Sequence, residues 1–331
     1  MWIALGALVS LGLLVLAFVL VLHFTAPVPP GDAPEVAVKA IPSDWIEPPV
    51  AQTESEESAT SSGRATWRST GALALTADGR SFGEETYELS VSVDGAVLKS
   101  SGRFWFKILL ATVNVAFEQR WEGGAGLEPT LYTLHLNAPF GQGQDIAGAL
   151  DGNRFAVRRN RNETSLSIAP ERTIVLGTFS TYALVPLWFE ERQQDGAASF
   201  DVLLFGGPPG AASVGGDGEL PKVTVERDGT ASARGDGLMI HVERYKISSP
   251  FGDSVLYAKG REFLALVAGT PDRPLLVHRS DYFPQGFNVV DTQNATGALQ
   301  LVENLGYRAT RTFITYRKPL AQPDAAGAAR K

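Results

Sequence analysis

Apolar and polar residues alternate with a period of two along most of the chain between residues 67 and 316. In ETYELSVSV, Tyr87 and Leu89 lie on one side of an extended chain and Glu88 lies on the other. This alternation is typical of antiparallel strands that bury one face. The same pattern recurs in ATVNVAFEQRW, TLYTLHL, NRFAVRR, SLSIA, ASFDVLLF, PKVTVER, GLMIHVERY, DSVLYA, EFLALVA and TRTFITY.

Turn-forming dipeptides separate these segments at intervals of roughly ten residues, which indicates a meander of hairpins. They are Asp78-Gly79, Asp94-Gly95, Gly123-Gly124, Asp151-Gly152, Asp228-Gly229 and Asp236-Gly237. Helix is favoured only at residues 180–192 and 298–304. We therefore predict an all-β domain at residues 66–318, a large antiparallel and strongly curved sheet (half-barrel) or a β-sandwich. The Gly-rich segment 205–221 is a candidate boundary between two subdomains.

The chain begins with one apolar run, residues 1–22, that contains no charged residue. As a helix it would be about 33 Å long, enough to cross a hydrocarbon core of about 30 Å. A cleaved signal peptide would have a charged start and a small-residue cleavage site, which the exit HFTAPVPP does not offer. A buried core helix would need an apolar partner, which the acidic continuation lacks. We expect a signal anchor at residues 1–24 in a single-pass membrane protein, with the bulk of the chain extracytoplasmic (periplasmic or cell-surface side).

Residues 25–65 are rich in proline and carry seven acidic and two basic residues. This composition predicts a disordered linker, and a coil of about 40 residues spans roughly 35 Å. Trp45 and Ile46 are the exception, since both are costly to leave in water. They either pack on the domain surface or dock an envelope protein partner. The Ala- and Pro-rich residues 319–331 are predicted to be a disordered tail.

Composition excludes several classes of function. The chain has no cysteine, so it has no disulfide framework, Cys-ligated zinc, iron–sulfur cluster or thiol nucleophile. Its net charge is −7, and most of that charge is in the linker. The folded region has no basic surface for a phosphate backbone, so nucleic acid is not an expected partner.

Candidate catalytic chemistry is sparse, and the sequence lacks the common hydrolase, dinucleotide and metal-binding motifs. His135 and His241 alternate with apolar neighbours, which favours the polar face of a sheet over a metal site. In LLVHRSDYF, Ser280 and His278 could form a nucleophile–base pair, but side chains two positions apart on a strand are about 7 Å apart. The ordinary alternative pairs Arg279 with Asp281 on one face. We expect a chain that is not an enzyme, with no catalytic residue, metal or cofactor.

Two aromatic-rich passages break the alternation, at residues 104–110 and 182–189. They belong either to elements buried on both sides or to a greasy cavity on one face of the sheet. In the second case the ligand-binding residues would be Phe104, Trp105, Phe106, Trp121, Tyr182, Trp188 and Phe189.

The order of these segments resembles that of the LolA/LolB- and LppX-like curved-sheet carriers of bacterial envelopes, and of a related uncharacterised envelope family. The resemblance covers roughly residues 67–290. It rests on RSFGEETYELSVS, LKSSGRFWFKI, FEQRWEGGAGLEPTLYTLHLN, TFSTYALVPLWF, MIHVERYKIS, GDSVLYAKGREFLALV and RPLLVHRSDYFP. It implies an acyl chain held against the concave face of the sheet and no catalytic residues. A permanent anchor in place of a cleaved signal or lipid implies a tethered role instead of shuttling.

Two functions follow from these observations. The first is a membrane-tethered, non-catalytic β-domain that binds a lipid or another apolar ligand. The alternative is a structural or interaction subunit of an envelope assembly, with a fully packed core and no ligand. The two differ in whether the aromatic residues line a cavity or fill a core.

Overall fold

The computed structural model describes residues 37–45, 66–108, 111–139, 143–205, 220–235, 238–270 and 273–290. Within these ranges no helix has both the length and the apolar character needed to cross a membrane. The expected anchor at residues 1–24, the helix predicted at 298–304 and the tail at 319–331 lie outside the described residues.

The predicted all-β fold is confirmed: sixteen strands form one sheet, in which β16 pairs with β11 and the others follow the order β8-β7-β6-β5-β4-β3-β2-β1-β15-β14-β13-β12-β11-β10-β9. The strands are β1 (Trp67–Ala77), β2 (Arg80–Ser92), β3 (Gly95–Ile108), β4 (Ala111–Gly123), β5 (Pro129–Asn137), β6 (Gln144–Asp151), β7 (Arg154–Arg159), β8 (Asn162–Ser167), β9 (Thr173–Leu176), β10 (Ala197–Leu204), β11 (Lys222–Gly235), β12 (Leu238–Ser248), β13 (Ser254–Lys259), β14 (Glu262–Thr270), β15 (Arg273–Arg279) and β16 (Asn288–Val290). Neighbours along this path are antiparallel, except β9 and β10, which are parallel. The sheet is not closed, because β8 and β9 stand at opposite ends of the path.

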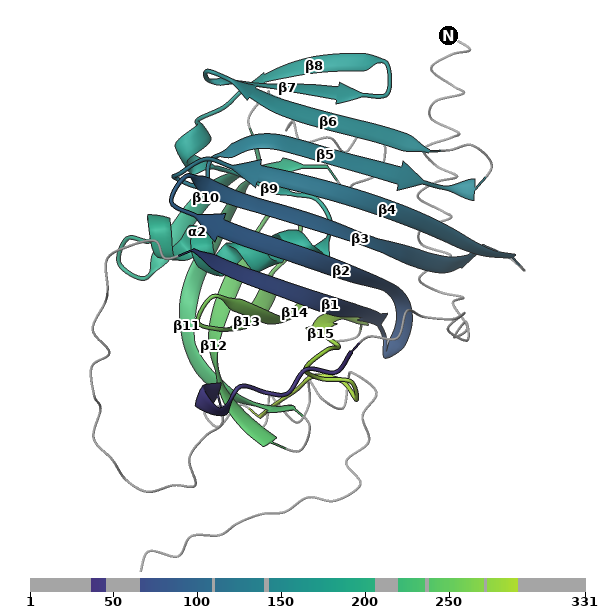
Figure 1. Ribbon diagram of the computed structural model, residues 1–331, viewed down its shortest axis with the longest axis vertical. Coiled ribbons are helices and arrows are strands. Elements are labelled where there is room, and N and C mark those ends of the chain that lie inside the picture. Colours follow the sequence, from purple (N-terminus) through teal and green to yellow (C-terminus); the bar gives the residue numbers. More distant parts are fainter. Residues whose placement is uncertain are drawn as a thin grey trace, which may run out of the picture.

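The sheet folds over so that β1 to β8 form a front layer and β10 to β15 lie behind it (Figure 1). The short helices η4 (Phe179–Leu184) and α2 (Val185–Arg192) lie inside this fold, where the sequence favours helix, and η4 contacts both β2 and β14. Two further 3₁₀ turns are η1 (Ser43–Trp45) and η3 (Pro170–Arg172). The main core consists of the inward side chains of both layers together with η4 and α2.

A second apolar cluster covers the other face of the rear layer. In β13, Leu256 packs into the main core while its neighbour Tyr257 packs into the second cluster. In β14, Leu266 packs into the main core, whereas Leu264, the extra residue at a register shift with β13, packs into the second cluster. The rear strands are thus buried on both faces, which explains the continuous apolar run of EFLALVA.

Turns predicted from the sequence are present at some positions, and at one position the structure has a strand instead. Asp78 and Gly79 join β1 to β2 with φ angles of 51° and 70°, as a type I′ hairpin turn requires. The prediction of a turn at Asp228-Gly229 is wrong. These two residues lie inside β11, where the register with β12 shifts between Arg227 and Thr230. The extra residues form a bulge, and the strand continues past it.

A buried polar network holds η4 against the front layer. The carboxylate of Glu85, which is 1% exposed, accepts hydrogen bonds from Thr178 Oγ1 at 2.5 Å and from the backbone N–H of Ser180 at 3.1 Å. Gln119 Oε1 accepts the Thr178 backbone N–H at 2.8 Å and the Tyr132 hydroxyl at 3.0 Å. Side chains of β2 and β4 therefore fix the start of η4, and Tyr132 of β5 supports Gln119.

Burial raises the pKa of Glu85 above its ordinary value, although the hydrogen bonds from Ser180 and Thr178 oppose the rise. The native state then binds more protons than the unfolded state between the two pKa values. The stabilising contribution is complete below about pH 4.5 and is lost as the pH rises through the raised pKa.

We therefore expect the Glu85→Gln variant to lose less unfolding free energy than the wild type between pH 4.5 and pH 7.5. Glutamine cannot titrate, yet it can still accept from Ser180 and bond the neighbouring hydroxyls. Urea unfolding across this range measures the difference, with Glu118→Gln on the exposed face as control. Parallel pH profiles for Glu85→Gln and wild type would contradict the expectation.

Candidate functional site

Three of the predicted ligand-binding residues pack against other aromatic rings deep in the main core. Trp121, Trp188 and Phe189 are each at most 1% exposed. The Trp121 and Trp188 rings meet edge to face with centroids 5.9 Å apart, and Phe189 meets Tyr245 at 5.2 Å. Trp188 Nε1 also donates to the backbone oxygen of Leu127 at 3.3 Å. These contacts are those of a filled interior.

Phe104 and Tyr182 pack at the border of the same core. Phe104 stacks on Phe117 with ring centroids 4.8 Å apart and meets Phe179 edge to face at 6.3 Å. Tyr182 is partly buried against the core cluster. Phe106 is half-buried and shares the side of β3 on which Phe104 lies.

Trp105 lies on the opposite face of β3 from its two neighbours. Its Nε1 donates to the backbone oxygen of Ser81 at 3.1 Å, and the Arg103 guanidinium lies 5.7 Å from its ring centroid. The structure therefore brings six of the seven predicted residues to the inside of the sheet and leaves Trp105 outside.

The pairing predicted for Arg279 and Asp281 is present at the junction of β1 and β15. Arg279 is buried and donates from Nε and Nη2 to the two carboxylate oxygens of Asp281, at 2.7 and 2.8 Å. Nη1 donates to the Tyr87 hydroxyl at 2.9 Å and to Glu262 at 3.0 Å, and Nη2 also donates to the backbone oxygen of Thr70 at 2.9 Å. The cluster is structural in character, because it joins four segments of the sheet.

The neighbouring His278 and Ser280 have separate partners. Ser280 Oγ donates to the backbone oxygen of Ala72 at 3.2 Å. Burial lowers the pKa of His278 to about 4, and a hydrogen bond to the Phe283 backbone only partly opposes this. The Nδ1 of His278 is buried without a hydrogen-bond partner among the described residues, so this neutral imidazole is a packing residue. His135 and His241 are exposed, as predicted for the polar face of the sheet.

A hollow lies on the outer face of the front layer. Two adjoining depressions, of about 750 and 700 Å³, share the lining residues Thr86, Ser101, Glu118 and His135. We call them together the outer groove. Among the described residues, no group of three or more His, Asp or Glu side chains is placed to hold a metal ion.

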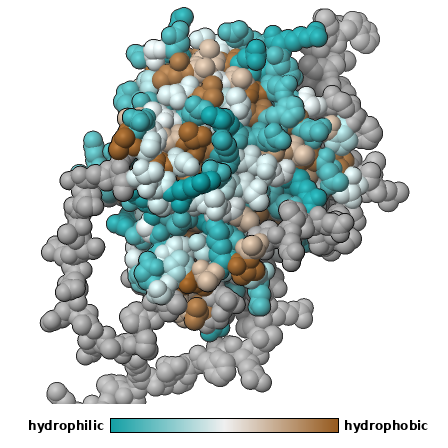
Figure 2. All heavy atoms as spheres, viewed as in Figure 1, coloured by the Kyte–Doolittle hydropathy of each residue, from teal (hydrophilic) through white to brown (hydrophobic). Residues whose placement is uncertain are grey.

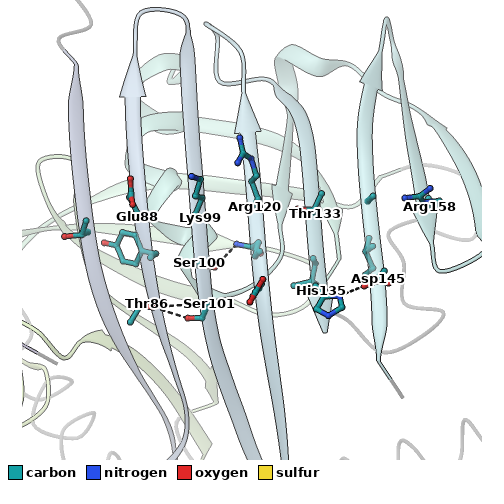
Figure 3. Close-up of a pocket in the computed structure, with 17 residues that line it drawn as sticks. Thr86, Glu88, Lys99, Ser100, Ser101, Arg120, Thr133, His135, Asp145 and Arg158 are labelled. Carbon is teal, nitrogen blue, oxygen red and sulfur yellow. Dashed lines mark hydrogen bonds and ion pairs between the residues drawn. The ribbon is translucent and has the colours of Figure 1, made fainter. Parts of the chain in front are cut away.

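Strand register arranges the polar side chains of the outer groove in two rows across the sheet (Figure 3). One row consists of Glu88, Lys99, Arg120, Thr133, Ala147 and Arg158, each paired with the next on the neighbouring strand. The other row consists of Thr86, Ser101, Glu118, His135 and Asp145. At about 4.8 Å per strand the first row is roughly 24 Å long.

Both signs of charge are present in the outer groove, and two of its cations are free. Arg120 is bonded to Glu122 at 2.5 Å, and His135 is paired with Asp145. Lys99 and Arg158 are exposed and make no hydrogen bond or ion pair with any described residue. Lys99 also lies directly opposite Arg120, a pairing of like charges that costs free energy. An anionic group placed between them would remove that cost.

Figure 2 shows this face, over which polar side chains predominate and hydrophobic residues are scattered. Sequence reasoning singled out Trp105, His135 and Ser280 among the groove residues, but for other roles and not as parts of one groove. The remaining groove residues are ordinary polar positions of alternating strands, and the available signal was the concentration of charged and hydroxyl residues at outward positions of β2 to β4.

No family model matches the chain, and no curated protein matches it significantly. Similar solved structures include the following two. One is a β-barrel-like protein of the domain of unknown function DUF1849 from Brucella abortus, with 9% identity and a TM-score of 0.42 over 64% of this chain and 94% of that one. The other is a DUF1089 family protein from Pseudomonas aeruginosa, with 10% identity and a TM-score of 0.35 over 65% of this chain and 95% of that one. The resemblance to the LolA/LolB- and LppX-like carriers stays an expectation.

The placement of the tryptophans predicts unequal effects on stability. Trp188→Ala removes a ring from a packed core and should lower the free energy of unfolding by about 3–5 kcal/mol. Trp105→Ala removes a ring from the outer face and should cost about 1 kcal/mol, mostly through its hydrogen bond. Urea unfolding of the two matched variants measures this, and equal losses would place both rings in the same kind of environment.

Proposed function

We propose that this protein is a non-catalytic interaction subunit of a cell-envelope assembly that binds a partner protein through the outer groove. Residues 1–24 tether it to the membrane as a signal anchor, with the β-domain extracytoplasmic. The observation that carries this proposal is the mutual packing of the aromatic residues. Because Trp121, Trp188 and Phe189 fill the core, the recognition surface has to be sought on the outside of the sheet.

A protein partner suits the outer groove better than a polyanion does. Lys99, Arg120 and Arg158 are balanced by Glu88, Glu118 and Asp145 along the two rows. A surface that carries both signs of charge selects its partner by electrostatic complementarity, which suppresses incorrect pairing. The free cations Lys99 and Arg158 are the positions at which carboxylates of a partner would gain most.

The surroundings of the candidate catalytic residues support a non-catalytic role. His278 is kept neutral by burial, and Ser280 is bonded to a backbone oxygen. The pair His135–Asp145 is largely exposed, with 63% and 73% of the two side chains accessible. The pair is therefore not enclosed in a water-excluded site, which is where charged catalytic groups act most strongly.

A second candidate function, binding of an apolar acyl ligand inside the sheet, is favoured by one specific observation. The indole N–H of Trp121 is buried and has no hydrogen-bond partner among the described residues. An unsatisfied buried donor costs about 1–3 kcal/mol. The carbonyl or carboxylate of an acyl ligand would supply the missing acceptor.

The charge-reversed variant Lys99→Glu/Arg158→Glu tests the proposed function. In the native host it should fail to complement a deletion strain at wild-type abundance, because the glutamates that replace both free cations would repel the carboxylates of the partner. A photo-crosslinker placed at Thr133 should lose its adduct in the same variant.

Lys222→Glu/Lys246→Glu is the matched control, since it makes the same charge change at exposed positions of β11 and β12. It should retain both complementation and the crosslink. Full complementation by the groove variant would refute the groove proposal. Titration of the full chain with a fluorescent fatty acid then decides the second candidate.

A further inference from the structure

A short segment of the region expected to be a linker is seated on the domain. Residues 37–45, here called the N-terminal strap, contact the junction of β1 and β15. The backbone N–H of Lys39 donates to the backbone oxygen of Asp281 at 2.7 Å. The Lys39 ammonium lies 3.2 Å from Asp281 Oδ2 and donates to Thr70 Oγ1 at 3.1 Å and to the Thr70 backbone oxygen.

The second contact of the strap is at its far end. Trp45 is 7% exposed and belongs to the second apolar cluster, against which Ile41 is also packed. Its ring centroid is 5.1 Å from that of Tyr282. Ile46, the other residue predicted to pack or dock, lies outside the described residues. Trp45 itself takes the first of the two expected roles, packing on the domain.

Both contacts converge on one aromatic ring. Tyr282 has the Arg279 guanidinium 4.5 Å and the Lys39 ammonium 5.7 Å from its centroid, in addition to Trp45. The adjacent Asp281 carboxylate is ionised, since Arg279 and Lys39 outweigh the opposing effect of burial and hold its pKa below the ordinary value. A carboxylate beside an aromatic ring can bind a segment that carries a cationic group and, further along, an apolar group.

The nine residues of the strap make few contacts with the domain. Between its two contacts Ala40, Ser43 and Asp44 are exposed, and Ala37 and Val38 before them are exposed as well. Ordering nine residues costs conformational entropy at each residue, whereas two side chains supply most of the contact. A segment held in this way exchanges with competitors of the same chemistry.

We propose that the strap seat, formed by Asp281, Tyr282 and the adjoining second cluster, is a docking site for peptide segments of partner proteins. It takes a segment in which a cationic residue precedes an aromatic residue by six positions, as Lys39 precedes Trp45. The chain's own strap occupies the seat in cis and is displaced by the partner. This site adjoins the outer groove at Thr70, but Asp281 and Tyr282 do not line the groove, and the proposal does not depend on the function proposed for the groove.

A peptide is the occupant that the contacts specify. The Lys39 backbone N–H bonds the Asp281 backbone oxygen, and this main-chain contact is one that a lipid or a free cation cannot reproduce. The fixed spacing between the ammonium and the indole requires a chain of defined length between them. The seat therefore recognises a backbone group, a charge and a ring together.

The test uses the full chain carrying Lys39→Ala and Trp45→Ala, which empties the seat, and a fluorescent peptide AVKAIPSDW as probe. The peptide should bind the emptied variant saturably. It should bind the wild type at least about tenfold more weakly, because the cis strap competes at a high effective concentration. The same titration is made with Trp45→Ala alone, which removes only the indole of the strap, in case the double variant is unstable.

Changes in the peptide provide the controls, since they cannot affect folding of the domain. Replacing the lysine or the tryptophan of the peptide by alanine should each weaken binding at least about tenfold, because each removes one of the two contacts. Replacing its serine, which corresponds to the exposed Ser43, should leave binding unchanged.

Three results would overturn the proposal. They are no binding to either emptied variant, binding that ignores the lysine and tryptophan changes, and equal binding to wild type and emptied variants. A wild-type dimer that the free peptide dissociates would also overturn the cis arrangement. It would assign the seat to a second copy of the chain.

Discussion

The guanidinium of Arg279 is buried where the front and rear layers of the sheet join, and its hydrogen bonds reach both layers. The β1–β15 junction consists of five paired positions, from Leu73 opposite Arg279 to Ala77 opposite Leu275. Arg279 extends this junction sideways, to Tyr87 of β2 and to Glu262 and the Phe263 backbone of β14. Leaving such a charge unpaired typically costs 3–5 kcal/mol. The relative placement of the two layers, and of everything between them, depends on this cluster.

The residues next to the buried Arg279 leave space for its side chain. Gly71 of β1 faces Tyr87, and a Cβ at this position would overlap the Tyr87 ring and lie 2.7 Å from Arg279 Nε. A side chain there would displace the ring whose hydroxyl accepts from Arg279. On the same inward face of β2 as Tyr87, Glu85 performs the corresponding task for η4. The two buried ionisable groups thus fix the layers to one another and the helices to the layers.

Much of the fold can be predicted from the sequence, because a strand with one buried face reveals itself by alternation. The segments around Tyr87, Tyr132 and Phe155 are strands in the predicted positions, and helix appears at 180–192 as expected. The pairing of Arg279 with Asp281 was also predicted, although Asp281 lies in the turn just after the end of β15 and not on the strand. What the alternation cannot reveal is which strands are neighbours when they are far apart in sequence. The β1–β15 junction, and with it the open path of the sheet, is of this kind.

The candidate sites show the same limit. The rows of the outer groove exist because five register relations bring Glu88, Lys99, Arg120, Thr133 and Arg158 into line, and no local pattern encodes five registers at once. The aromatic passages were recognisable as unusual, but whether rings such as Trp188 meet a ligand or one another depends on the packing between layers. In β14 the run EFLALVA did signal burial on both faces, although a period of two was assigned to it.

The position of the strap has a mechanical consequence. A pull applied to the chain at Ala37 reaches the sheet first at Lys39, which is bonded to Asp281 and to Thr70 of β1. Part of the load passes from Asp281 through Arg279 into β2 and β14 as well. Force from the N-terminal side is thereby spread over three strands instead of peeling one strand from its edge. Below the load at which the strap detaches, the sheet is shielded, and above it the strap lengthens the chain before any strand yields.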